Sequence, residues 1–100
     1  MAKTTYIKFE MDGCNPCAMS ANFIKEQTSI TEETLTNPEV ELSSLENKLY
    51  VVNVGETPEL AGLFEVASVP TFIKLENGVE VERFSGFQPP KLKQIEVDLK

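Results

Sequence analysis

The feature that most restricts the fold is a strand-like run that leads directly into two closely spaced cysteines. Residues Thr4–Met11 have the sequence TTYIKFEM, a β-branched and aromatic run with side chains alternating between two faces, which is typical of a strand. The run ends at the turn pair Asp12-Gly13, and Cys14-Asn15-Pro16-Cys17 follows. Pro16 suits a first helical turn, because its missing N–H would have no partner there. Helical spacing in Ala18–Gln27 completes a predicted unit of strand, tight turn and helix.

The C-terminal half contains the same two kinds of pattern. Asn77-Gly78 separates two alternating runs and is the strongest short signal for a hairpin, because both turn positions need positive φ. A strand–helix–strand unit followed by a hairpin and a covering helix predicts an α/β fold with a mixed sheet. The expected elements are a buried strand at Leu49–Val54, a helix at Pro58–Glu65, hairpin strands at Pro70–Glu76 and Val79–Ser85, and an amphipathic helix at Lys91–Leu99.

Between these halves lies an acidic segment, Ser29–Lys48, whose pattern is the hardest to interpret. Pro38 can open a short helix across Glu39–Glu46, and the rest is expected to be a solvated surface excursion. Its charged residues are one lysine, Lys48, against the glutamates Glu32, Glu33, Glu39, Glu41 and Glu46.

Length and charge limit the classes of function. A chain of 100 residues suits one domain, expected over residues 1–100. The net charge of −7 is a poor footprint for binding nucleic acid. No early segment resembles a secretory signal, and no apolar run approaches the roughly 20 residues that span a bilayer. The sequence therefore predicts a soluble cytoplasmic protein with no role on membranes or nucleic acid.

A reducing compartment makes the cysteine pair the main candidate for chemistry. Thiols stay reduced there, so a close pair is more often catalytic or metal-binding than a structural staple. Cys14 lies beside the free N–H groups of a first helical turn, which stabilise a thiolate and lower the thiol pKa. We therefore expect Cys14 to be the nucleophile and Cys17 to resolve the mixed disulfide, with Asn15 and Pro16 between them setting the redox poise.

Two other interpretations of the pair stay open at this stage. Zinc normally takes four Cys, His or carboxylate ligands, whereas the chain has two cysteines and no histidine, so a zinc site would need two chains. An inert pair is the other alternative. We expect no metal and no bound cofactor.

The motif and several later residues together resemble the thioredoxin family. CNPC after a strand is similar to the CGPC of thioredoxins, and Val69-Pro70-Thr71 is similar to their cis-proline loop. The similarity continues without gaps over residues 49–99 and also covers the first strand with its cysteine motif. Other positions that fall at the family's spacing are Asn53, Pro58, Asn77, Gly78 and Gly86.

The resemblance implies a thioredoxin-like fold in a minimal form. Because the cysteine motif begins at residue 14, the family's usual first strand and helix are absent. We therefore expect a four-stranded mixed sheet flanked by helices, in the order β-α-β-α-β-β-α.

The resemblance also implies substrate-binding positions around the motif. The proline that matches Pro70 is cis in thioredoxins and lies against the disulfide. The residue that matches Val69 offers its backbone to an extended substrate strand, a form of β-augmentation. Gly86 would keep the groove wall low for that strand. Gly13 stands where thioredoxins have a tryptophan, which predicts a flatter and less apolar surface beside Cys14.

The most informative departure from the family is Lys8, at the place of a buried aspartate thought to assist proton transfer at the second cysteine. A cation lowers the pKa of a nearby thiol, whereas a carboxylate raises it. One hypothesis puts Lys8 under the motif, where it helps to hold a thiolate. The alternative is that its amine reaches solvent beside Glu10 and only its stem is buried. Asn22 also replaces a family proline that kinks the active-site helix, which predicts a straighter helix.

These features predict a thiol–disulfide oxidoreductase that works as a dithiol reductase of protein disulfides. The resemblance implies a monomer recharged by a thioredoxin-reductase-like flavoenzyme, and family analogy alone suggests ribonucleotide reductase as a client. Two alternatives stay open. One is a glutaredoxin-like enzyme that uses glutathione, for which Lys8 is the only nearby basic residue. The other is a non-enzymatic adaptor whose groove binds a partner strand.

Overall fold

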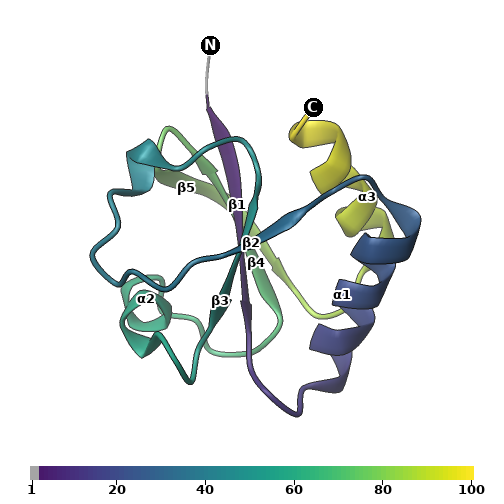
Figure 1. Ribbon diagram of the computed structural model, residues 1–100, viewed down its shortest axis with the longest axis horizontal. Helices are drawn as coiled ribbons and strands as arrows, with labels where there is room; N and C mark the ends of the chain where they lie inside the picture. The colour runs from purple at the N-terminus through teal and green to yellow at the C-terminus, as the bar shows by residue number, and fades with distance from the viewer. Residues whose placement is uncertain (1–2) are drawn as a thin grey trace.

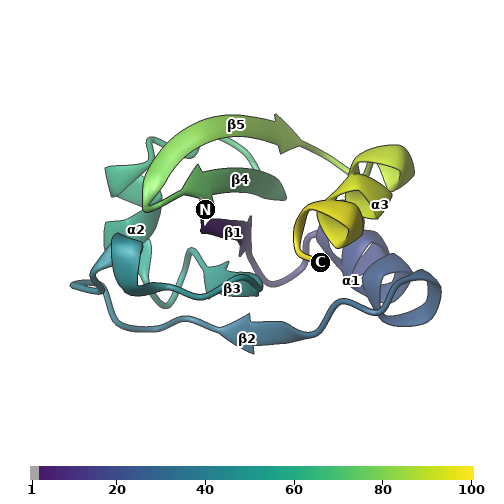
Figure 2. The same ribbon diagram turned by 90° about the horizontal axis from the view of Figure 1, so that it is seen from above.

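A mixed sheet of five strands forms the centre of the molecule, as Figures 1 and 2 show. The computed structural model describes residues 3–100. The strand order is β2-β3-β1-β4-β5, with β1 (Thr4–Glu10) in the middle. β1 runs parallel to β3 (Leu49–Asn53) and antiparallel to β4 (Thr71–Glu76). β5 (Val79–Ser85) extends the sheet beside β4, and β2 (Glu32–Thr34) pairs parallel with β3 at the other edge.

Helices cover both faces of this sheet (Figure 2). α1 (Asn15–Gln27) and α3 (Pro89–Asp98) lie together on one face, and α2 (Pro58–Leu63) lies on the other. Neighbouring residues of a strand point to opposite faces, so β1 contributes to two cores. Tyr6 packs with apolar side chains of α1 and α3, whereas Ile7 belongs to the core on the α2 side.

The expected α/β arrangement with a mixed sheet is confirmed, and so is the hairpin between β4 and β5. Asn77 and Gly78 have φ values of 52° and 83°, which is the left-handed conformation that the turn requires. The last helix begins at Pro89, slightly before the expected start, because proline suits the first position of a helix.

The expected count of four strands is wrong, because the acidic excursion supplies a fifth. β2 forms inside Ser29–Lys48 and pairs along the free edge of β3. The Leu35 N–H continues this pairing by donating to the Val51 carbonyl at 2.8 Å. Without β2, that edge of β3 would keep unpaired backbone groups, and β2 supplies partners for them.

The rest of the excursion is mostly exposed, as its charge suggests, but two of its leucines anchor it to the core. Leu35 and Leu45 are only 8% and 5% exposed, and they join the core on the α2 side with Leu60. A single 3₁₀ turn, η1 (Leu42–Ser44), stands where a helix across Glu39–Glu46 was expected. An irregular segment thus buries the apolar residues without forming that helix.

The 3₁₀ turn packs directly on the β4–β5 hairpin. A Cβ atom added at Gly78 would lie 2.7 Å from the backbone nitrogen of Ser43 and 2.9 Å from its Cα. Lys3, directly before β1, also contacts this 3₁₀ turn, because its Nζ donates to the Ser43 carbonyl at 2.8 Å. The turn and the excursion therefore fit together because residue 78 lacks a side chain.

No helix within residues 3–100 has the length and apolar character that crossing a membrane requires.

Candidate active site

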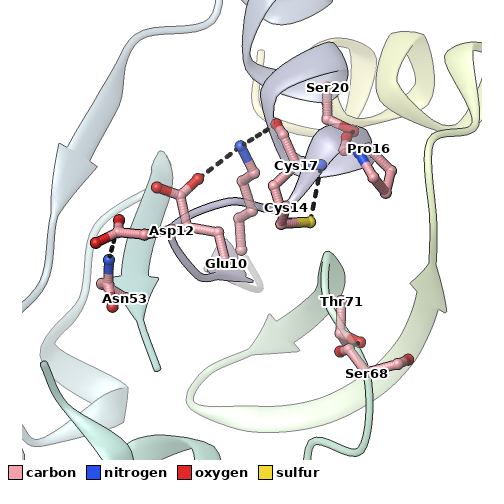
Figure 3. The surroundings of a disulfide bond; sticks show 10 residues. Glu10, Asp12, Cys14, Pro16, Cys17, Ser20, Asn53, Ser68 and Thr71 are labelled. Atoms are coloured by element: carbon pink, nitrogen blue, oxygen red, sulfur yellow. Dashed lines mark hydrogen bonds and ion pairs between the residues drawn. A yellow bond between two sulfur atoms is a disulfide. The ribbon is translucent and has the colours of Figure 1, made fainter. Parts of the chain in front are cut away.

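The cysteine pair lies where β1 ends and α1 begins (Figure 3). Cys14 and Cys17 form a disulfide, and their Cα atoms are 5.2 Å apart. Cys14 is the N-cap of α1, and its sulfur accepts a hydrogen bond from the Cys17 N–H at 3.1 Å. Pro16 occupies the first turn of the helix, as expected. A first-turn amide thus already points at the sulfur on which a thiolate would form, and the helix dipole adds to its effect.

The two cysteines differ in their access to solvent. Cys14 is half-buried, whereas Cys17 is 4% exposed. Gly13, Asn15 and Pro16 around Cys14 are exposed. Gly13 has a φ of 79°, and no atom lies within 4 Å of the position that its Cβ would take. The accessible sulfur is suited to attack on a partner, and the buried sulfur to a step within the molecule.

Lys8 lies under the start of α1 and is 0% exposed. Its Nζ donates to the Cys17 carbonyl at 3.2 Å and lies 2.9 Å from the Glu10 carboxylate. Figure 3 draws these two contacts as the dashed lines that lead from Cys17 to Glu10. The structure combines the two sequence-based interpretations: the lysine lies beneath the motif, and its amine pairs with Glu10 but does not reach solvent.

A second carboxylate, Glu32 of β2, faces the same group of charges. Its register partner Leu49 also pairs with Tyr6, which puts Glu32 on the face of the sheet that carries Lys8. Partial desolvation raises the pKa of the Glu32 carboxyl above its ordinary value, the charge of Lys8 opposes this rise, and Glu10 adds to it. Sequence reasoning missed Glu32, since no local pattern places the excursion beside β3.

The loop before β4 lies at the same end of the sheet. The Val69–Pro70 peptide bond is cis, as the resemblance implies. Thr71 Oγ1 donates to the Ser68 carbonyl at 2.7 Å and lies 2.9 Å from Ser85 Oγ. Thr71 pairs with Phe9 near the end of β1, which fixes the loop close to the cysteines. Figure 3 includes Ser68 and Thr71 among the surroundings of the disulfide.

Gly86 and Val69 shape an open edge beside this loop. The Gly86 N–H donates to the Pro70 carbonyl at 2.9 Å, and no atom lies within 4 Å of the position of a Cβ at residue 86. Within residues 3–100, no hydrogen bond joins the Val69 N–H or C=O to another group. A cleft of about 150 Å³ adjoins Val69 and is lined on another side by Met11. The Val69 backbone is therefore free to pair with an extended strand.

The charges at this end of the molecule are acidic. Segments 10–17, 53–57, 68–71 and 85–88 contain Glu10, Asp12 and Glu56, and they contain no lysine or arginine. Asn53 Nδ2 donates to Asp12 Oδ1 at 3.2 Å, which ties the turn before Cys14 to β3. In the described part of the chain, no three His, Cys, Asp or Glu side chains are grouped so that they could hold a metal ion.

A disulfide at the start of a helix, with a cis-proline loop at the same end of a central mixed sheet, is the arrangement of a protein with the thioredoxin fold. The chain belongs to the thioredoxin family, whose sequence model, described as Thioredoxin, matches residues 1–97.

Individual relatives agree with this assignment. The chain is 36% identical over 95 residues to the SPbeta prophage-derived thioredoxin-like protein YosR of Bacillus subtilis, with 94% of this chain and 96% of YosR covered. It is 28% identical to the thioredoxin of Alicyclobacillus acidocaldarius, with 97% and 79% covered. Among solved structures, the thioredoxin of Fasciola hepatica superposes with a TM-score of 0.67 at 27% identity, over 98% of this chain and 82% of that one.

The thioredoxin-like fold expected from the sequence is thus confirmed, with five strands in place of four. Family membership together with the intact cysteine pair supports thiol–disulfide oxidoreductase chemistry as the class of activity.

Proposed function

We propose that this protein is a dithiol reductase of protein disulfides. In the reduced protein, the Cys14 thiolate attacks one sulfur of a substrate disulfide, a mixed disulfide forms, and the other substrate sulfur leaves as a thiolate. The Cys17 thiolate then attacks Cys14 Sγ and displaces the second substrate sulfur. Two electrons pass to the substrate, and Cys14–Cys17 becomes a disulfide. The observation that carries this proposal is the position of Cys14 as the N-cap of α1.

The backbone around Val69 supports a polypeptide as the substrate. An extended segment next to the cysteines can pair with the free N–H and C=O of Val69, in the manner of an added strand. Open space at Gly86 and at Gly13 lets the backbone of such a segment approach. The cleft between Val69 and Met11 offers room for one of its apolar side chains.

Lys8 supports the second half of the reaction. Its ammonium lies 3.2 Å from the Cys17 carbonyl and is fully enclosed, so little water screens its charge from Cys17, although the Glu10 carboxylate balances part of it. Nearby positive charge favours the thiolate over the thiol. We assign to Lys8 the role of favouring the Cys17 thiolate during resolution of the mixed disulfide.

The acidic surroundings of Cys14 argue against the glutathione-dependent alternative. Glutathione carries two carboxylates, and basic side chains are the groups that would bind them. The segments at this end hold Glu10, Asp12 and Glu56 without lysine or arginine, and Lys8 is buried in an ion pair. A protein substrate fits these charges better, with the Cys14–Cys17 disulfide then reduced again by a thioredoxin-reductase-like flavoenzyme.

The cellular setting of the proposal rests on family analogy. We propose a monomer in the cytoplasm that draws electrons from such a flavoenzyme, with ribonucleotide reductase as one client to be tested.

The experiment is insulin reduction with NADPH and a bacterial thioredoxin reductase, run beside a glutathione-coupled assay. Wild-type protein is expected to turn over only in the first assay. Cys14→Ser should reduce the rate to background, and Cys17→Ser should trap a mixed disulfide visible by mass spectrometry. Full activity of Cys14→Ser would overturn the mechanism. Turnover only with glutathione would favour the glutaredoxin-like alternative. Wild-type protein that is inactive in both assays but retains a bound partner strand would favour the adaptor.

A further inference from the structure

The ion pair beneath α1 contains one partner that the proposed chemistry has not used. Lys8 is fully enclosed, whereas the Glu10 side chain is 31% exposed, and their charged atoms are 2.9 Å apart. An ammonium enclosed without an opposite charge is strongly disfavoured, and a flexible lysine then moves toward water. Glu10 is the charged partner that the structure gives Lys8 in this enclosed place.

Few other groups face the lysine. Its neighbours across the sheet are Val51 on β3 and Phe72 on β4, which carry no charge. α1 contributes Cys17 with its carbonyl, and Glu32 of β2 adds a second carboxylate at the edge of the sheet. The Lys8 ammonium is thus held between a carboxylate on the solvent side and the Cys17 carbonyl on the helix side.

We infer that Glu10 is a positioning residue for the resolving step: it holds the Lys8 ammonium in place and directed at Cys17. This inference rests on the proposed dithiol chemistry, in which the Cys17 thiolate forms a bond to Cys14 Sγ while the bond from Cys14 to the departing sulfur breaks. The Cys17 proton goes to solvent beforehand. Glu10 touches neither sulfur, so its effect passes through Lys8.

A competing explanation predicts the opposite effect of removing the Glu10 charge on formation of the Cys17 thiolate. If Glu10 only screened Lys8, removing its charge would expose Cys17 to the full positive charge and make the thiolate easier to form. If Glu10 positions Lys8, removing its charge lets the lysine move away from Cys17, and the thiolate becomes harder to form. The direction of the change in pH dependence therefore separates the two.

The test uses Ellman's reagent as the partner, so it needs no protein substrate. Reduced protein attacks the reagent through Cys14, giving a mixed disulfide and one nitrothiobenzoate ion, and Cys17 then displaces a second ion. The rate of this second release is measured by stopped flow from pH 5 to 9. The variants are Glu10→Gln, Lys8→Met, the double variant and Glu10→Asp. Glu33→Gln is the matched control, because its carboxylate pairs with Lys48 at an exposed site.

Positioning predicts that Lys8→Met and Glu10→Gln each slow the second release about tenfold at pH 7, which is one pKa unit of thiolate stabilisation. The double variant should be no slower than either single one, Glu10→Asp should recover part of the rate, and Glu33→Gln should match wild type. A faster release in Glu10→Gln, an unchanged rate, or additive losses in the double variant would overturn the inference. Circular dichroism checks that each variant is folded. If Lys8→Met does not fold, the comparison of Glu10→Gln with Glu10→Asp decides the question. Because this readout is independent of insulin reduction, either proposal can fail alone.

Discussion

Replacing Gly78 by alanine tests whether the acidic excursion is a packed part of the fold. The new methyl group would lie 2.7 Å and 2.9 Å from the backbone nitrogen and Cα of Ser43. These are backbone atoms of η1, so no side-chain rotation can relieve the overlap. Overpacking of this kind costs about 1–3 kcal/mol. The φ of 83° adds about 1–2 kcal/mol for a residue with a Cβ. We expect a loss of about 2–5 kcal/mol in the free energy of unfolding.

Gly86→Ala provides the matched control for this variant. Gly86 has a φ of 84°, almost the same as that of Gly78, but no atom lies within 4 Å of its Cβ position. It should show the backbone cost alone, about 1–2 kcal/mol. The difference between the two variants then measures the contact of the hairpin turn with Ser43.

The assay is urea unfolding followed by far-ultraviolet circular dichroism, with thermal melts as a second measure. For a domain of this size each kcal/mol corresponds to roughly 4–8 °C in Tm. Gly78→Ala should therefore have a Tm at least about 4 °C below that of Gly86→Ala. The slope of the unfolding free energy against urea concentration should be the same in both variants. If the two variants unfold at the same urea concentration, the excursion does not pack on the turn, and the reasoning is refuted.

Three further predictions concern buried contacts and pH. Leu45→Ala should cost about 2–5 kcal/mol in chemical unfolding, whereas Leu63→Ala, at a side chain 63% exposed, should stay within about 0.5 kcal/mol of wild type. Burial raises the pKa of Asp98, but hydrogen bonds from Tyr6, Gln94 and Lys74 outweigh it and hold the pKa below its ordinary value. Stability from Asp98 is therefore present above about pH 4 and is lost as the pH falls through its folded-state pKa, so Asp98→Asn should flatten the acid limb of a stability–pH curve. Burial, with the hydrogen bond to Asp98, raises the pKa of Tyr6. Its unfolded state releases a proton near pH 10 and its folded state does not, so stability should fall more steeply above pH 10 in wild type than in Tyr6→Phe.

The parts of the fold that the sequence predicts are those specified by local chemistry. Alternation in residues 4–11, the proline at the start of α1 and the Asn77-Gly78 turn each act within a few residues, and each element formed where expected. The cysteine pair belongs to the same class, since its position at a helix start follows from the residues on either side.

The parts that escaped prediction depend on contacts between distant segments. A three-residue strand such as β2 has no periodicity to detect, and it exists because the edge of β3 is free. Leu35 and Leu45 stand among glutamates, so their burial depends on a core that the segment itself does not encode. The enclosure of the Lys8–Glu10 pair likewise depends on α1 closing over the strand, and local residues left open whether the lysine lies under the motif or reaches solvent beside Glu10.

The brevity of β2 has a consequence for how copies of this protein meet. Long, flat, apolar strands at the margin of a sheet recruit strands from other chains and begin aggregation. β2 ends one margin with three exposed residues, two of which are Glu32 and Glu33. The other margin, β5, carries Glu80 and Glu82 beside an irregularity in its pairing with β4. The carboxylates at both margins therefore disfavour the addition of a strand from another copy.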